Sequence, residues 1–104
     1  MIKELLPNEN FEDVTKNGIS IVDFNATWCG PCKMLHPNLL EVSEELKNYQ
    51  FLSVDVDKHA QLAAKFNIRA VPTIFVIKDG KPIKATTGYM DSQAIKNFIA
   101  NSLN

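Results

Sequence analysis

The sequence predicts an α/β fold, in which helices join the parallel part of a sheet and one antiparallel hairpin is added. Three observations support this prediction. Strand-like apolar runs alternate with helix-like segments in the order β-α-β-α-β-α-β-β-α. The dipeptide Asp79-Gly80 separates the last two strand-like runs, as in a β-hairpin. The length of 104 residues, 45% of them hydrophobic, fits one core, so residues 1–104 form one predicted domain.

The first quarter of the chain contains two predicted strands and a short helix. Ile2 to Leu6 is a half-apolar run that fits either an edge strand or an ordered arm. A helix is expected after Pro7, with Asn8 as its N-cap and Asn17-Gly18 as its end. Ile19 to Asn25 is apolar on both alternating faces, which is typical of a central strand covered on both sides.

The middle of the chain begins with a long amphipathic helix. Its apolar side chains fall at helical spacing from Leu35 to Tyr49, with charged residues at the remaining angles. Phe51 to Val56 is the next predicted strand. Asp57 is expected to cap a short helix that ends near Asn67.

The last part of the chain contains the predicted hairpin and a terminal helix. Its strands are Thr73 to Ile77 and Ile83 to Thr87. Asp91 is expected to cap the final helix, whose apolar positions include Ile95 and Ile99.

The chemistry of the chain is concentrated in Trp28-Cys29-Gly30-Pro31-Cys32-Lys33, which holds the only two cysteines. Gly30 and Pro31 turn the backbone between the thiols, so the pair can close a small disulfide ring. The ring opens a helix, whose N-terminal dipole favours the thiolate of Cys29 and lowers its pKa. Cys32 lies where it can resolve a mixed disulfide. The pattern predicts a redox pair in which Cys29 attacks and Cys32 resolves.

Other uses of the cysteines fit less well. A zinc site needs four ligands, and only His36 and His59 could join the two thiols. Haem attachment needs a histidine directly after the second cysteine, where Lys33 stands. Inert buried thiols remain the simplest alternative to redox chemistry.

Asp23 is the one acidic residue in the predicted central strand. Burial disfavours an ionised carboxylate, so its pKa should rise and it should find a partner or a water molecule. The residues alone favour a functional and a purely structural role equally.

Charge and composition exclude several function classes. The 11 basic and 12 acidic residues give a net charge of −1 without like-charge blocks, which disfavours nucleic-acid and membrane binding. Met1 to Asn10 lacks the apolar run of a signal peptide, so we expect a cytoplasmic protein. A redox pair without further cysteines also fits a reducing compartment.

Several segments together resemble the thioredoxin family. They occur in the family's order, cover nearly the whole chain and comprise Val22-Asp23-Phe24, Trp28 to Lys33, Pro37, Arg69-Ala70-Val71-Pro72-Thr73 and Lys78-Asp79-Gly80. The resemblance implies a mixed, five-stranded sheet with helices on both faces. It also implies a thiol–disulfide oxidoreductase that reduces disulfides of cytoplasmic proteins.

The resemblance implies a role for individual residues as well. Asp23 would lie beneath Cys32 and help to deprotonate it. The bond before Pro72 would be cis, and Val71 would pair its backbone with an extended substrate segment. The predicted substrate-binding residues are Trp28, Gly30, Pro31, Val71, Pro72 and Gly88, with Tyr89 and Met90 as further candidates.

The family also implies how such a protein works with others. No bound cofactor is expected, because the electrons reside on the Cys29–Cys32 pair. Thioredoxin reductase would recharge the pair with electrons from NADPH. The expected partners are this reductase and oxidised proteins, and the expected state is a monomer.

Two residues depart from the family's pattern. Asn25 stands where many members have a second tryptophan, and Ser53 where many have a lysine close to the matching aspartate. Without that cation, Asp23 should be harder to ionise. Two further functions stay open at this stage, a more oxidising disulfide exchanger and a non-catalytic interaction module.

Overall fold

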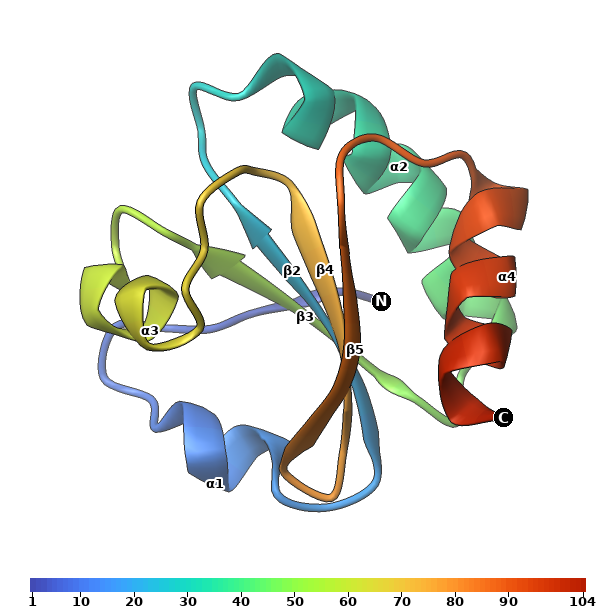
Figure 1. Cartoon of the computed structure of the whole chain (residues 1–104), viewed down its shortest axis with the longest axis horizontal. Coiled ribbons are helices and arrows are strands. Elements are labelled where there is room, and N and C mark those ends of the chain that lie inside the picture. Colours follow the sequence, from blue (N-terminus) through green and yellow to red (C-terminus); the bar gives the residue numbers. More distant parts are fainter.

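The computed structural model describes residues 1–104 and contains one five-stranded sheet in the order β1-β3-β2-β4-β5. Parallel pairing joins β1, β3 and β2, whereas β4 is antiparallel to both β2 and β5 (Figure 1). The strands are β1 (Lys3–Glu4), β2 (Ile19–Asn25), β3 (Gln50–Asp55), β4 (Thr73–Lys78) and β5 (Lys81–Thr87). The predicted mixed α/β sheet is therefore confirmed.

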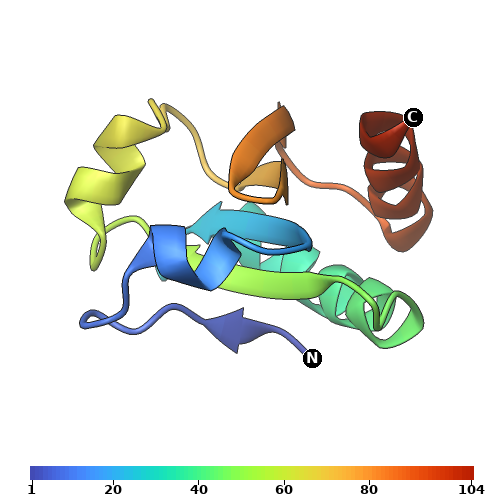
Figure 2. The same ribbon diagram turned by 90° about the horizontal axis from the view of Figure 1, so that it is seen from below.

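Four helices cover the two faces of this sheet (Figures 1 and 2). They are α1 (Phe11–Thr15), α2 (Gly30–Glu45), α3 (Ala60–Lys65) and α4 (Ser92–Leu103). One core cluster joins α2 and α4 to Ile21 and Ile74 of the sheet. The other cluster lies against α1 and α3 and includes Phe24. Each helix is too short or too polar to cross a membrane.

The alternation of side chains along β2 decides which residues meet α2. Ile21 belongs to the cluster under α2 and α4, whereas Val22 and Phe24 belong to the opposite cluster. Successive side chains of a strand point to opposite faces, so Asp23 lies on the same face as Ile21. Asp23 is thus buried at the end of the sheet where α2 begins.

Two predicted helix caps are wrong. Asn10, not Asn8, caps α1, because its side chain accepts the backbone N–H of Asp13 at 2.9 Å. His59, not Asp57, holds the N-cap position of α3, without a side-chain cap. The preceding turn is instead held by Asp55, whose Oδ1 accepts the N–H of Asp57 at 2.8 Å.

The remaining predicted elements agree with the structure to within a few residues. Ile2 to Leu6 contains the short edge strand β1. The hairpin turns at Asp79-Gly80, but β5 begins at Lys81 and so includes Pro82. Proline is tolerated there because β5 is an edge strand and needs no hydrogen bond on its outer side. Asp91 caps α4 as predicted, since it accepts the N–H of Ala94 at 2.8 Å.

Candidate functional site

Cys29 and Cys32 form a disulfide at the N-terminus of α2. Cys29 is the N-cap residue, and its sulfur accepts the backbone N–H of Cys32 at 3.2 Å. Gly30 and Pro31 begin the helix between them, since proline suits a first turn that has no partner for its N–H. The hydrogen bond and the helix dipole both favour negative charge on the Cys29 sulfur. Each cysteine is only 5% exposed.

Asp23 is buried on the sheet face beneath this helix terminus, with 1% of its surface exposed. Its Oδ2 accepts the side-chain N–H of Asn25 at 3.2 Å, whereas its Oδ1 receives no hydrogen bond. Burial raises the pKa of Asp23 from 3.8 to about 6, although the Asn25 hydrogen bond opposes the shift. Burial thus moves the pKa of the Asp23 carboxyl group towards neutrality.

A small cavity of about 180 Å³ connects this carboxyl group with the second cysteine. It is lined by Asp23, Asn25, Ala26, Cys32, Lys33, His36 and Ser53. A cavity of this size can hold water between two polar groups. Asp23 and Cys32 therefore line one hollow that is large enough for a water molecule.

The segment before β4 forms the opposite wall of the disulfide. The Val71–Pro72 peptide bond is cis, as the resemblance implied, and the carbonyl oxygen of Val71 lies 3.6 Å from Sγ of Cys29. The N–H of Gly88 donates to the carbonyl of Pro72 at 2.9 Å. Gly88 has φ of 97°, and a Cβ built on it would meet open space. This wall thus leaves room beside the sulfur atoms.

Trp28 stands on the surface next to Cys29 and is 68% exposed. Its indole N–H donates to Oδ2 of Asp57 at 3.0 Å, so the polar edge of the exposed ring has a hydrogen-bond partner. A shallow hollow of about 210 Å³ lies beside the Trp28 ring and is lined by Trp28, Val56, Ile68, Arg69, Ala70 and Val71. This apolar surface adjoins the disulfide.

Comparisons with known proteins agree with this geometry. The sequence model of the family described as Thioredoxin matches residues 2–101. The chain belongs to the thioredoxin family. It is 38% identical to the thioredoxin of Staphylococcus saprophyticus over 92% of this chain and 93% of the relative. It is 35% identical to the thioredoxin of Chlamydia trachomatis over 93% and 95% of the two chains.

Solved thioredoxin structures have the same fold. The thioredoxin of Malassezia sympodialis superposes with a TM-score of 0.87 at 32% identity, covering 99% of this chain and 94% of the other. The oxidised thioredoxin of Plasmodium falciparum gives 0.85 at 33% identity, covering 97% of each chain. Family membership and the Cys29–Cys32 pair together identify a thiol–disulfide oxidoreductase of the protein-disulfide reductase type.

The sequence did not predict three hydrogen bonds around this site. Asn38 of α2 donates to the hydroxyl of Tyr89 at 3.0 Å and to the carbonyl of Met90 at 3.1 Å. It thereby ties the segment after Gly88 to the helix that carries the cysteines. Asp57 was assigned to a helix cap and instead holds Trp28. In the sequence, Asn38 is only a polar residue within a predicted helix, and Asp57 is only an acid before one. Neither position indicates its contact.

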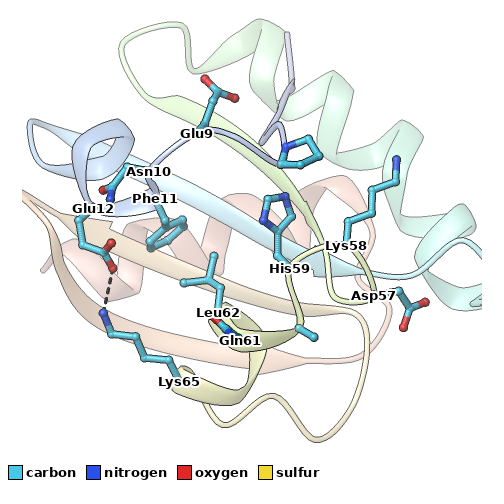
Figure 3. A pocket seen from close by; sticks show the side chains of 12 residues that line it. Glu9, Asn10, Phe11, Glu12, Asp57, Lys58, His59, Gln61, Leu62 and Lys65 are labelled. Atoms are coloured by element: carbon cyan, nitrogen blue, oxygen red, sulfur yellow. Dashed lines mark hydrogen bonds and ion pairs between the residues drawn. The ribbon is translucent and has the colours of Figure 1, made fainter.

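The largest hollow of the molecule lies away from the thioredoxin disulfide. It measures about 550 Å³ and lies between α1 and α3, and neither cysteine lines it (Figure 3). Lys65 and Glu12 form an ion pair of 2.9 Å across it, and His59 contacts the carbonyl of Leu5 at 2.9 Å. His36 lies instead on α2, so the two histidines of the zinc alternative belong to different surfaces.

Proposed function

We propose that Cys29 attacks disulfides of oxidised proteins and that Cys32 completes the exchange. In the reduced protein, the Cys29 thiolate bonds to one substrate sulfur, and the other substrate sulfur leaves with the bonding electron pair and takes up a proton. Cys32 then loses its proton and bonds to Cys29, which releases the second substrate thiol. The substrate gains two electrons and two protons, and Cys29–Cys32 becomes a disulfide. The observation that carries this proposal is the position of Cys29 as N-cap of α2.

Asp23 accepts the proton of Cys32 in this proposal. The shared cavity supports this role, because it connects the carboxyl group with Cys32. The raised pKa of about 6 also suits a base, since a general base works best when its pKa is near the working pH. At pH 7 such a group is mostly ionised and still basic enough to accept a proton.

The substrate lies as an extended segment across the surface around Cys29. The residues proposed to bind it are Trp28, Gly30, Pro31, Val71, Pro72 and Gly88. Val71 pairs its backbone with the segment, as a strand pairs with a sheet edge. The exposed indole of Trp28 and the open space at Gly88 support this proposal.

The proposal extends to the protein's cellular setting. Thioredoxin reductase returns electrons from NADPH to the Cys29–Cys32 pair, and no cofactor is bound. The protein works as a monomer in the cytoplasm. Use of both cysteines in one redox pair, with none for structural cross-links, supports a reducing compartment.

Reduction of insulin disulfides by the wild type and the two cysteine variants tests the mechanism. Cys29→Ser should lose all activity and form no adduct. Cys32→Ser should stop after the first step and accumulate a mixed disulfide with its substrate that dithiothreitol releases. A Cys29→Ser variant that still reduced insulin would refute the assignment. A reduction potential well above that of the glutathione pool would instead indicate an oxidising exchanger.

A separate variant tests the role of Asp23. Asp23→Asn should slow the second step about 100-fold or more at pH 7, because general base catalysis typically contributes at least this much. The first step should change little, since Asp23 lies behind Cys32. An unchanged second step would remove Asp23 from the mechanism and leave the roles of the cysteines intact.

A further inference from the structure

The carboxyl group of Asp23 accepts a hydrogen bond from one residue only, and that residue is Asn25. The two residues are separated by one position on β2, so their side chains lie on the same face of the sheet. Nδ2 of Asn25 lies 3.2 Å from Oδ2 of Asp23 and 3.2 Å from its backbone oxygen. The same nitrogen lies 2.8 Å from Oγ of Ser53 on β3.

These contacts fix the orientation of the Asn25 amide. An amide nitrogen carries two hydrogens, and here it faces three acceptors, so both hydrogens are engaged. Ser53 is the register partner of Asp23 on the neighbouring strand. The sheet therefore fixes Asn25, Ser53 and Asp23 relative to one another.

The arrangement makes the two oxygens of Asp23 unequal. Oδ2 accepts a hydrogen bond, whereas Oδ1 has no donor and less than 1 Å² of accessible surface. The occupied oxygen has part of its negative charge stabilised, so a proton prefers the other one. Oδ1 is thus the carboxyl oxygen that is left free to take up a proton, and Asp23 lines the same hollow as Cys32.

We propose that Asn25 is a positioning residue for thiol–disulfide exchange, which holds Oδ2 of Asp23 so that Oδ1 receives the Cys32 proton. This inference rests on the proposed role of Asp23 as proton acceptor. Ser53 supports it by anchoring the amide of Asn25. The pair Asn25 and Ser53, which departs from the family's pattern, thus forms a neutral hydrogen-bond support for the acid.

No charged side chain forms an ion pair or hydrogen bond with the carboxyl group of Asp23, so Asn25 is its one hydrogen-bond partner. Lys33 and His36 of α2 are exposed and line the same cavity, but neither forms a hydrogen bond or ion pair with Asp23. Asp55 is the register partner of Asn25, and its Oδ1 is engaged by the turn after β3. Glu4 lies two strands away and pairs with Lys58.

The test separates the two steps of exchange in stopped flow. Reduced protein reacts with dithionitrobenzoate, which releases one coloured thiolate when Cys29 attacks and a second when Cys32 resolves the mixed disulfide. Both rates are measured from pH 5 to pH 8 for the wild type, Asn25→Ala, Ser53→Ala and Asp23→Asn. Carboxyl-carbon NMR titration follows Asp23 in the wild type, Asn25→Ala and Ser53→Ala, the three proteins that keep this carboxyl group.

Asn25→Ala should leave the first step within about twofold of wild type. The midpoint of the second step should move up by about one pH unit, because a hydrogen bond to a charged acceptor contributes about that much to its pKa. The NMR midpoint of Asp23 should move by the same amount. Ser53→Ala, which keeps the amide but removes its anchor, should give a smaller shift in the same direction. Asn101→Ala, an exposed position of α4, should match wild type.

Three outcomes would overturn the inference. Unchanged midpoints of the second step and of the Asp23 titration in folded Asn25→Ala and Ser53→Ala would make Asn25 a packing residue. A shifted NMR midpoint with an unshifted second step would separate the contact from the reaction. An unchanged second step in Asp23→Asn would reject the proposed role of Asp23 itself, and that variant identifies this case independently of Asn25.

Discussion

The indole N–H of Trp28 donates to the carboxylate of Asp57 across 3.0 Å, although 68% of the Trp28 surface is exposed. Asp57 follows β3, whereas Trp28 precedes α2. The contact therefore joins the ends of two parallel strands above the sheet. It holds a large apolar ring beside Cys29, where a free side chain would sample several rotamers.

Removing this contact should weaken substrate binding more than catalysis. Asp57→Ala should raise KM for insulin about 2- to 10-fold, as expected for a lost hydrogen bond of about 0.5–1.5 kcal/mol, with little change in kcat. The fluorescence anisotropy of Trp28 should fall. Asp57→Asn keeps an acceptor oxygen and should restore most of both values. Equal kinetics for all three proteins would show that the indole needs no tether.

The buried acid should make stability depend on pH in a defined direction. The pKa of Asp23 is about 6 in the folded state against 3.8 for the free group, so folding favours its protonated form. Stability from this group is therefore present below pH 4 and is lost as the pH rises through 6. The loss amounts to about 3 kcal/mol, because one pKa unit corresponds to about 1.4 kcal/mol.

Urea unfolding of oxidised wild type and Asp23→Asn at pH 3.5 and pH 8 measures this loss. The oxidised form avoids titration of the cysteines. The difference in unfolding free energy between the two proteins should shift in favour of Asp23→Asn by about 3 kcal/mol between these pH values. A difference that is the same at both pH values would mean that Asp23 has an ordinary pKa in the folded protein.

Replacing Gly88 or Gly18 by alanine adds one methyl group. Comparison of the two variants separates its effect on backbone strain from its effect on substrate binding. Both glycines have positive φ, 97° and 75°, with open space at the Cβ position. Gly88→Ala and Gly18→Ala should each lose about 1 kcal/mol of stability, because alanine is strained at positive φ. Only Gly88→Ala should also raise KM for insulin, since only Gly88 is bonded to Pro72 in the proposed substrate-binding surface. Thermal unfolding and steady-state kinetics decide between these effects.

Asn38 should act on the segment after Gly88 without touching the cysteines. Asn38→Ala removes the hydrogen bonds to Tyr89 and Met90. The amides of this segment should then exchange hydrogen faster, and KM should rise a few-fold, about the loss of one net hydrogen bond. Asn48→Ala, an exposed position without side-chain contacts, is the matched control. Unchanged exchange at Gly88 and Met90 would contradict the bracing role.

Replacing Asn10 or Asn8, the two asparagines before α1, should change the free energy of unfolding by different amounts, because only Asn10 caps the helix. Asn10→Ala should lose about 1 kcal/mol of unfolding free energy, the usual effect of removing an N-cap. Asn8→Ala should change it by less than about 0.5 kcal/mol, as for other surface positions. Chemical denaturation of both variants is sufficient. A larger loss at Asn8 would restore the cap predicted from the sequence.

The sequence predicted those features that depend on local pattern. β2 was found at its observed bounds because its apolar residues occupy both alternating faces, and Asp91 was recognised because an acid precedes a clear amphipathic helix. Pro7 pointed to Asn8 as a cap, but the turn it starts continues to Asn10. Asp57 has the right spacing for a cap, yet a tertiary contact with Trp28 uses its carboxylate. Caps are decided by such competition, which a local pattern does not contain.

The site divides in the same way. The two cysteines could be identified from their spacing at the start of a predicted helix, and Asp23 from its place in an apolar strand, although the residues alone favoured a functional and a structural role for Asp23 equally. Asn25 and Ser53 were noticed only as departures from the family's pattern. Their contacts, and those of Asn38, could not be predicted, since they depend on register between strands and on packing between α2 and the segment after Gly88. Polar residues that support a site carry no pattern of their own in a single sequence.

The antiparallel pairing of β4 with β2 sets the order in which the site becomes complete during synthesis. Cys29 and the carbonyl of Val71 are in contact although 42 positions separate them in the chain. A ribosome therefore exposes both thiols well before the wall that faces them has been translated. In a nascent chain the sulfur atoms are already available to oxidants, whereas the proposed substrate-binding surface is complete only when the second half of the molecule has folded onto the first.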